Sequence, residues 1–124
     1  MTTIYFVSPV YYDVASYTQL RSNILKELEK ENIFRSYKIQ FVVVDDTADL
    51  DPELNELKKY ADIRLVSVPF NLGHQRAIVH GIRKINSEIN DHDLVVTLDS
   101  DGEDRPEDIW QLLRPLLENK GSFK

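Results

Sequence analysis

Short runs of aliphatic and β-branched residues alternate with amphipathic stretches four times along this chain of 124 residues, and this alternation restricts the fold more than any other feature. The runs that predict strands cover residues 3–7, 39–44, 63–68 and 94–98. We expect a helix after each run, over residues 16–32, from residue 51, over residues 74–89 and from residue 106. Such an alternation implies right-handed crossovers, which place helices on both faces of a mostly parallel sheet. The pattern therefore predicts one α/β domain over residues 1–124, because the chain is too short for two domains of ordinary size.

Residues typical of helix N-termini, and apolar residues at helical spacing, support the expected helices. Ser16 and Gln19 have the spacing of a capping box at the start of the first helix. Asp51 followed by Pro52 is typical of a helix start, since aspartate caps free N–H groups and proline fits the first turn. Pro115 is expected to kink or end the last helix, because its ring clashes with the carbonyl four residues earlier. The expected apolar stripe of the third helix consists of Ile78, Ile82, Ile85 and Ile89.

Composition narrows the classes of function. The formal charge is −6, so a nucleic-acid partner is not expected, although a phosphate-bearing small ligand that arrives with a metal ion is compatible with it. The absence of cysteine excludes disulfides, thiolate zinc sites and cysteine nucleophiles, and it fits a reducing compartment. No apolar run is long enough to span a bilayer, and the start lacks the features of a secretory signal. We expect a cytoplasmic protein, or one at the cytoplasmic face of a membrane if the parent chain is longer.

The residues that follow the predicted strands are the ones that carry chemistry. In open parallel sheets, ligands bind beyond the carboxyl ends of the strands. Three of the four strand ends carry carboxylates, and the fourth leads to Arg76 near a helix N-terminus. Arg76 could meet a diphosphate there, where the helix dipole also favours anions, or it could form an ordinary surface ion pair.

An acidic loop follows the fourth strand, with four carboxylates within six residues: Asp99, Asp101, Glu103 and Asp104. Carboxylates this close repel one another unless a cation neutralises them. A hard divalent ion, Mg²⁺ or Mn²⁺, that also binds substrate phosphates is the natural partner. The alternative interpretation is a solvated acidic loop that caps the helix beginning at Pro106.

Two further strand ends offer contacts to a nucleoside. Asp45 and Asp46 end a nearly continuous apolar run, where a carboxylate could accept the N–H of a base or the hydroxyls of a ribose, or could simply close an Asx turn. Tyr11 could stack on a base or pack against the protein.

Four segments together resemble the nucleotide-sugar-binding half of family 2 glycosyltransferases with the GT-A fold. Residues 7–13 (VSPVYYD) are similar to the family's opening P-V-Y-N-E, and residues 42–46 (VVVDD) to its V-V-D-D-G-S. Residues 71–78 (NLGHQRAI) with Gly81 are similar to its N-x-G-x-x-x-A stretch, and residues 98–108 (LDSDGEDRPED) to its D-x-D region. The likeness covers nearly the whole chain. Departures are Asp13 for the usual Glu, Tyr12 for Asn, and Thr47-Ala48 for Gly-Ser.

The resemblance implies a role for each matching residue. The residues implied to line the nucleoside pocket are Pro9, Tyr11 and Asp13. The other implied donor contacts are Asp46 to the base, Asp99 near the ribose or sugar, and Arg76. The implied metal ligands are Asp101, on the diphosphate, and Glu103.

The resemblance also implies a reaction, in which a sugar passes with inversion from a nucleoside-diphosphate sugar to an acceptor such as a lipid phosphate, a glycan or a protein. Members of the family are longer, and their acceptor half and general base lie after the D-x-D region. We therefore expect the N-terminal half of a hexosyltransferase-type enzyme, inactive or nearly so as this fragment alone. The alternative is a non-catalytic nucleotide-binding or interaction module on the same scaffold.

Overall fold

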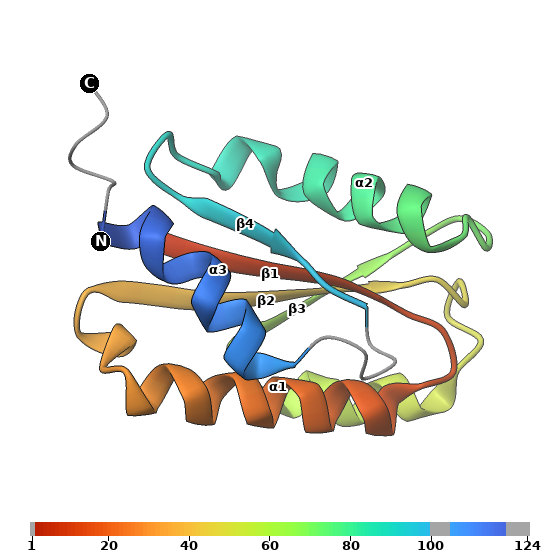
Figure 1. Cartoon of the computed structure of the whole chain (residues 1–124). Helices are drawn as coiled ribbons and strands as arrows, with labels where there is room; N and C mark the ends of the chain where they lie inside the picture. Colours follow the sequence, from red (N-terminus) through yellow and green to blue (C-terminus); the bar gives the residue numbers. More distant parts are fainter. Residues whose placement is uncertain (1, 100–104, 119–124) are drawn as a thin grey trace.

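The computed structural model describes residues 2–99 and 105–118 and contains one four-stranded parallel sheet with helices on both faces (Figure 1). The strands are β1 (Thr2–Val10), β2 (Tyr37–Asp45), β3 (Ile63–Ser67) and β4 (Leu94–Thr97). The α-helices are α1 (Val14–Lys30), α2 (His74–Ile85) and α3 (Pro106–Glu118). The short 3₁₀ helices are η1 (Ile33–Arg35), η2 (Pro52–Lys59) and η3 (Asn86–Glu88). This architecture confirms the predicted α/β class.

The strands lie in the order β3-β2-β1-β4, and every neighbouring pair is parallel. The long central strand β1 therefore pairs with β2 on one side, where Phe6 lies opposite Phe41, and with β4 on the other, where Phe6 lies opposite Val96. In Figure 1, α2 lies above the sheet, and α1, η2 and α3 lie on the opposite side. The carboxyl ends of all four strands meet at one end of the molecule, at the right in Figure 1.

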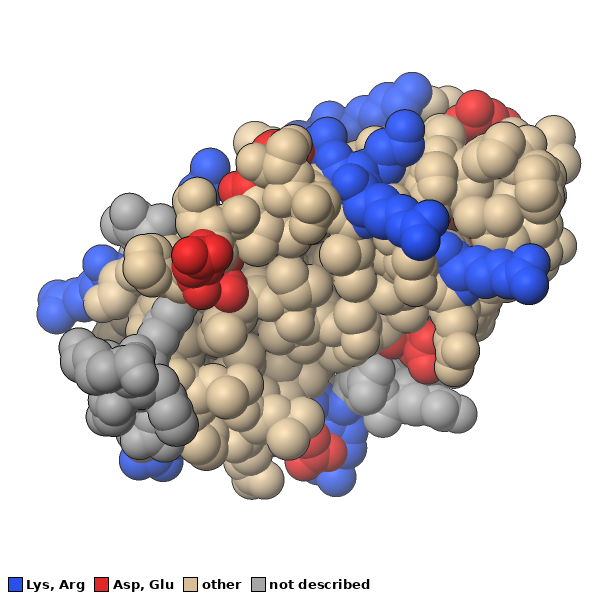
Figure 2. All heavy atoms as spheres, turned by 90° about the horizontal axis from the view of Figure 1, so that it is seen from above, with Lys and Arg blue, Asp and Glu red and all other residues tan. Residues whose placement is uncertain are grey.

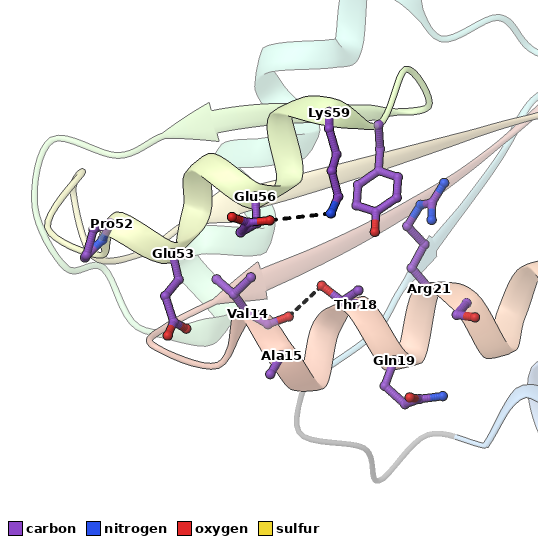
Figure 3. A pocket seen from close by; sticks show the side chains of 11 residues that line it. Val14, Ala15, Thr18, Gln19, Arg21, Pro52, Glu53, Glu56 and Lys59 are labelled. Atoms are coloured by element: carbon purple, nitrogen blue, oxygen red, sulfur yellow. Dashed lines mark hydrogen bonds and ion pairs between the residues drawn. The ribbon is translucent and has the colours of Figure 1, made fainter.

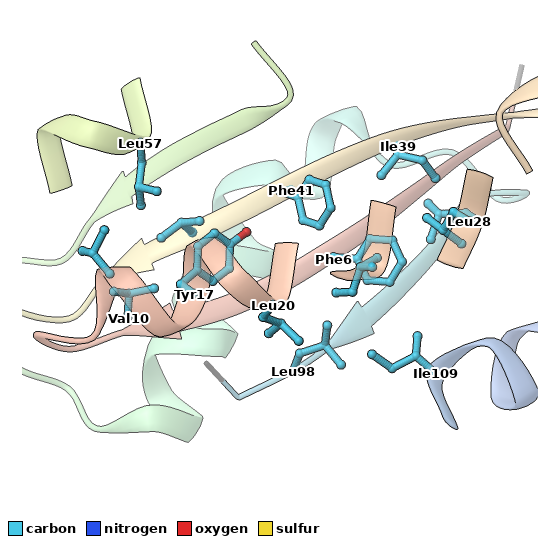
Figure 4. Packing of buried hydrophobic residues seen from close by; sticks show 14 of the residues in the cluster. Phe6, Val10, Tyr17, Leu20, Leu28, Ile39, Phe41, Leu57, Leu98 and Ile109 are labelled. Carbon is cyan, nitrogen blue, oxygen red and sulfur yellow. The ribbon is translucent and has the colours of Figure 1, made fainter. Parts of the chain in front are cut away.

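Alternation along β1 divides the core into two layers. Ile4 and Phe6 face α1, whereas Tyr5 and Val7 face α2, as expected for side chains that point to opposite faces of a sheet. In the α1 layer, the rings of Phe6 and Phe41 stack with their centroids 5.4 Å apart (Figure 4). Burial on both faces explains why residues 4–7 of β1 and 41–44 of β2 are all aliphatic or aromatic.

The helix α2 approaches the sheet closely through a glycine. A Cβ atom placed on Gly81 would lie 2.5 Å from Cγ2 of Val44 and 3.3 Å from Cγ1 of Val7. The buried side of α2 consists of small and aliphatic residues, Ala77, Gly81 and Ile85. The predicted stripe is therefore correct at Ile85, while Ile78 and Ile82 pack at its margin, half-buried.

Several predicted boundaries were wrong. The helix α1 begins at Val14, so Ser16 and Gln19 lie inside it and form no capping box. The second helix begins at the predicted place, with the Asp51 carboxylate accepting the N–H of Glu53, but it is a 3₁₀ helix. Pro115 does not end α3, which continues to Glu118. No helix in residues 2–99 and 105–118 has the length and apolar character needed to cross a membrane.

Candidate functional site

The strand order fixes where a ligand crevice can form. The chain runs from β1 outward through β2 to β3, and α2 then carries it back to β4 on the other side of β1. The connection that leaves β1 passes through α1 on one face of the sheet, and the connection that enters β4 passes through α2 on the other face. The strand order therefore reverses between β1 and β4, and such a topological switch point is where open α/β sheets bind ligands. The residues of interest are therefore those that follow the four strands.

A tight turn after β1 presents two aromatic rings. The backbone N–H of Tyr11 donates to Oδ1 of Asp13 at 2.8 Å, and Tyr12 adopts a left-handed conformation with φ of 57°. The two tyrosine rings meet edge to face, 4.8 Å between centroids, and remain 47% and 53% exposed. Two exposed rings at the strand ends provide an apolar surface on which a planar base could stack. The sequence indicated Tyr11 but not Tyr12, because a left-handed conformation at tyrosine has no sequence signal.

Pro9 lies in β1 itself, buried and opposite Val44 of β2. The pairing of β1 with β4 ends at Val7, so the missing N–H of Pro9 removes no bond from that ladder. The strand is consequently longer than predicted, and the contact implied between Pro9 and a nucleoside stays a prediction.

The two aspartates after the apolar part of β2 have different environments. The Asp45 carboxylate accepts the N–H groups of Thr47 and Asp49, so it closes the turn after the strand, as one of the two interpretations expected. Asp46 is only 1% exposed. Its Oδ1 accepts the N–H of Leu72 at 2.8 Å, and its Oδ2 accepts the N–H of Gly73 at 3.1 Å and the amide of Asn71 at 3.2 Å.

Asp46 therefore joins the end of β2 to the turn that starts α2. Asn71 strengthens this link, because its side chain also donates to the Asp46 carbonyl at 3.0 Å. Gly73 occupies the N-cap position with φ of 86°, a conformation that suits glycine. The base contact implied for Asp46 stays a prediction, and a base would have to share or displace these donors.

The end of β4 meets the start of α2. Nδ1 of His74 lies 3.6 Å from Oδ1 of Asp99, close enough for an ion pair when the imidazole is protonated. Both side chains are about half exposed. The N–H groups of the first turn of α2 have no carbonyl partners within the helix, so this end of α2 attracts anions. Asp99 therefore follows β4, as predicted, and lies beside the N-terminus of α2, which the sequence did not indicate. The implied contact of Asp99 with the ribose or sugar stays a prediction.

Among the described residues, one predicted site residue, Arg76, is not brought into this group. Arg76 lies on the outer side of α2, where it lines a cavity with Val79 and Arg83. Asp101 and Glu103 lie outside the described residues. Within residues 2–99 and 105–118, no three His, Asp or Glu side chains are placed to hold a metal ion, so the predicted metal site rests on the acidic loop.

A larger cavity, of about 830 Å³, lies between α1 and η2, away from the strand ends (Figure 3). Both of its cationic side chains are paired: Lys59 with Glu56, and Arg21, through three hydrogen bonds, with the carboxylate of Asp62. Arg21 also lies over the ring of Tyr60, 4.0 Å from its centroid. The Arg21–Asp62 ion pair joins α1 to the turn before β3. The cavity lies away from the strand ends, where open α/β sheets bind ligands.

Comparison with known proteins agrees with the geometry. The model of the family described as glycosyl transferase family 2 matches residues 14–123. This span begins after β1 and includes Asp46, Asp99 and the acidic loop. A comparison with curated proteins gave no match. Since the family match covers most of the chain and the fold is the one that the resemblance implied, the chain belongs to glycosyl transferase family 2.

Proposed function

We propose that this domain binds a nucleoside-diphosphate sugar at the carboxyl ends of its strands and presents the sugar for inverting transfer to an acceptor. The observation that carries the proposal is that three features meet at the switch point between β1 and β4. They are the turn with Tyr11 and Tyr12, the turn at residues 71–73 that Asp46 holds, and the Asp99 side chain beside the start of α2. Glycosyl transfer is the chemistry of the family. What we propose beyond the family is the class of donor, the use of a divalent metal ion, and the part of the donor that each residue contacts.

The nucleoside is expected to lie against β1. In this arrangement the rings of Tyr11 and Tyr12 stack on the base, and Pro9 and Asp13 form the floor and side of the pocket. Asp46 accepts an N–H of the base once the turn at residues 71–73 shifts to share its oxygens.

The diphosphate is expected to lie at the N-terminus of α2. The first-turn N–H groups there favour an anion, and His74 lies beside them at the start of the helix. Arg76 would reach the diphosphate only by folding back over the first turn of α2. Asp99, across from His74, is placed to bind hydroxyl groups of the ribose or sugar.

The acidic loop supplies the proposed metal site, in which Asp101 and Glu103 hold Mg²⁺ or Mn²⁺. Carboxylate oxygens are the ligands that both ions prefer. When bound, the ion supplies the positive charge that stabilises the departing diphosphate. The part of the protein described here binds and orients the donor, and the base that deprotonates a hydroxyl acceptor is proposed to lie beyond Lys124, in a cytoplasmic enzyme of hexosyltransferase type.

Calorimetric titration with UDP, GDP and CDP, with and without Mn²⁺, tests the proposal. We expect one nucleotide to bind in a metal-dependent way and Asp101→Ala to abolish that binding. Asp91→Ala is the matched control, because it removes an exposed carboxylate from the turn before β4, at the opposite end of the strands. Equal binding by both variants would contradict the proposed metal site.

One observation favours a second candidate, a non-catalytic nucleotide-binding or interaction module. All three donors around Asp46 come from the protein itself, so the carboxylate already has partners without any base. Failure of every nucleotide to bind, with or without metal, would favour an interaction module over the glycosyltransferase.

A further inference from the structure

The outer side of α2 differs in charge from the rest of the molecule. The chain has a formal charge of −6, whereas α2 carries Arg76, Arg83 and Lys84 and no carboxylate in its twelve residues. Figure 2, which looks down on the side of the molecule covered by α2, shows Lys and Arg side chains gathered in a band across that face. A cationic helix on an acidic protein is unexpected from composition, so we asked what the face could bind.

Helical periodicity places Arg76 and Arg83 away from the sheet and Lys84 on the flank of the helix. Ala77, Gly81 and Ile85 face the sheet, and Arg76 and Arg83, two turns apart, lie on the opposite side of the helix. Arg76 and Arg83 line one cavity of about 440 Å³. The two guanidinium groups therefore share one surface and can act on the same ligand.

The cations of α2 are not neutralised by the protein within the described ranges. Arg64 pairs with Glu88 and Arg21 with Asp62, but no ion pair joins Arg76, Arg83 or Lys84 to a carboxylate among residues 2–99 and 105–118. Three unneutralised cations on one short helix attract an external anion more strongly than isolated surface charges do.

Apolar side chains accompany the cations. Val79 is 48% exposed between Arg76 and Arg83, and Leu72 lines the same cavity. Phe70, in the loop that leads into α2, is 63% exposed. Cations beside exposed apolar groups match the boundary between lipid headgroups and acyl chains.

We propose that the outer face of α2 docks on an anionic lipid surface. Arg76, Arg83 and Lys84 contact the headgroups, and Val79 and Phe70 enter the interface. The negative charge of the remaining surface turns the other faces away from the bilayer, which sets the orientation. Because α2 begins at the carboxyl ends of the strands, a chain docked in this way holds that end of the sheet beside the headgroups.

Co-sedimentation of the 124-residue chain with vesicles tests the proposal and requires no nucleotide. We expect binding to vesicles of equal parts phosphatidylcholine and phosphatidylglycerol at low salt, with little binding at high salt or to phosphatidylcholine alone. The double variant Arg83→Gln/Lys84→Gln should weaken the apparent affinity by about thirtyfold, the effect of two basic residues near an anionic surface. Phe70→Ser should weaken binding in a way that salt does not change.

Lys26→Gln/Lys30→Gln is the matched control, because it removes the same charge from α1, on the opposite side of the sheet. This pair should bind anionic vesicles within about twofold of the parent chain. Circular dichroism and thermal melting verify that both double variants are folded. Absence of binding to anionic vesicles, equal losses in the two double variants, or binding to a DNA duplex in place of vesicles would overturn the proposal.

Discussion

Asp46 shows how one buried carboxylate can determine the shape of a site. It accepts two backbone N–H groups and one side-chain amide from residues 71–73, which lie far away in sequence. The sequence predicted that Asp45 and Asp46 end a strand, but it did not distinguish their roles. That distinction depends on donors from another loop, and local sequence carries no signal for them.

Asp46→Asn should lower the free energy of unfolding by about 2 kcal/mol, since the amide cannot accept as many bonds and the charge assistance is lost. Urea denaturation measures the change, with the exposed Asp91→Asn as the control that should leave stability nearly unaltered. Equal stabilities of the two variants would show that the bonds at Asp46 contribute little.

Tyr17 is a second informative residue, because its hydroxyl is buried and has no hydrogen-bond partner within the described structure. Burial raises the pKa of Tyr17 well above its usual value near 10. The folded state therefore retains the phenolic proton at pH values where the unfolded chain loses it. Stability attributable to this group is fully present below about pH 10 and is lost as the pH rises above that value.

Tyr17→Phe should consequently be as stable as the parent chain at neutral pH, or more stable by about 1 kcal/mol, because it removes an unsatisfied polar group. Its advantage should increase above about pH 10, where the parent chain loses stability. Urea denaturation at neutral and alkaline pH measures both effects. A variant that is clearly less stable at neutral pH would reveal a partner for the hydroxyl.

At the scale of elements, the sequence predicted the strands and α-helices found in residues 2–99 and 105–118, because hydrophobic periodicity is strong in this chain. The first and last residues of these elements could not be predicted from the sequence. The helix α1 begins earlier than predicted, at Val14, because the Asp13 carboxylate accepts the N–H of Tyr11 in a turn that helix propensity cannot predict. The order of the strands was also not predicted, since it depends on which side of β1 receives β4.

Gly81→Ala tests the close packing of α2 on the sheet. Alanine favours a helix over glycine by about 1 kcal/mol, but the added methyl group would lie 2.5 Å from Val44, a short and stiff side chain. Overpacking of a core costs about 1–3 kcal/mol, so we expect a net loss of stability in thermal melting. Gln75→Ala, on the exposed side of the same helix, should be neutral or slightly stabilising.

Pro115→Ala tests the unexpected continuity of α3. A proline inside a helix removes one backbone bond and strains the preceding turn, so its replacement should raise the free energy of unfolding by up to about 3 kcal/mol. Pro52→Ala serves as the control, since Pro52 is at the first position of η2, where proline is tolerated and no gain is expected. Loss of stability in Pro115→Ala would mean that the ring is needed for packing.

At the scale of the whole molecule, the candidate site is assembled from segments that are distant in sequence. The site combines the turn after β1, the aspartates at the end of β2, the turn before α2 and Asp99 after β4. These segments come together only when all four strands have paired. A ligand bound there therefore stabilises the entire sheet and not one loop.

If the proposed function holds, the nucleotide that binds in calorimetry should also raise the melting temperature when Mn²⁺ is present. At a ligand concentration one hundred times the dissociation constant, the added stability is about 2.7 kcal/mol, or roughly 10 °C for a domain of this size. The Asp101→Ala variant should lose this shift. A shift of equal size in both proteins would place the nucleotide elsewhere.

The position of β4 beside β1 also affects how the protein is made. The ribosome synthesises a chain from its N-terminus, so β1, β2 and β3 leave the exit tunnel well before β4. Until then, the edge of β1 that bonds the N–H of Leu98 has no neighbouring strand. A nascent chain therefore cannot form the complete crevice, or gain stability from a metabolite bound in it, before residue 99 has left the exit tunnel.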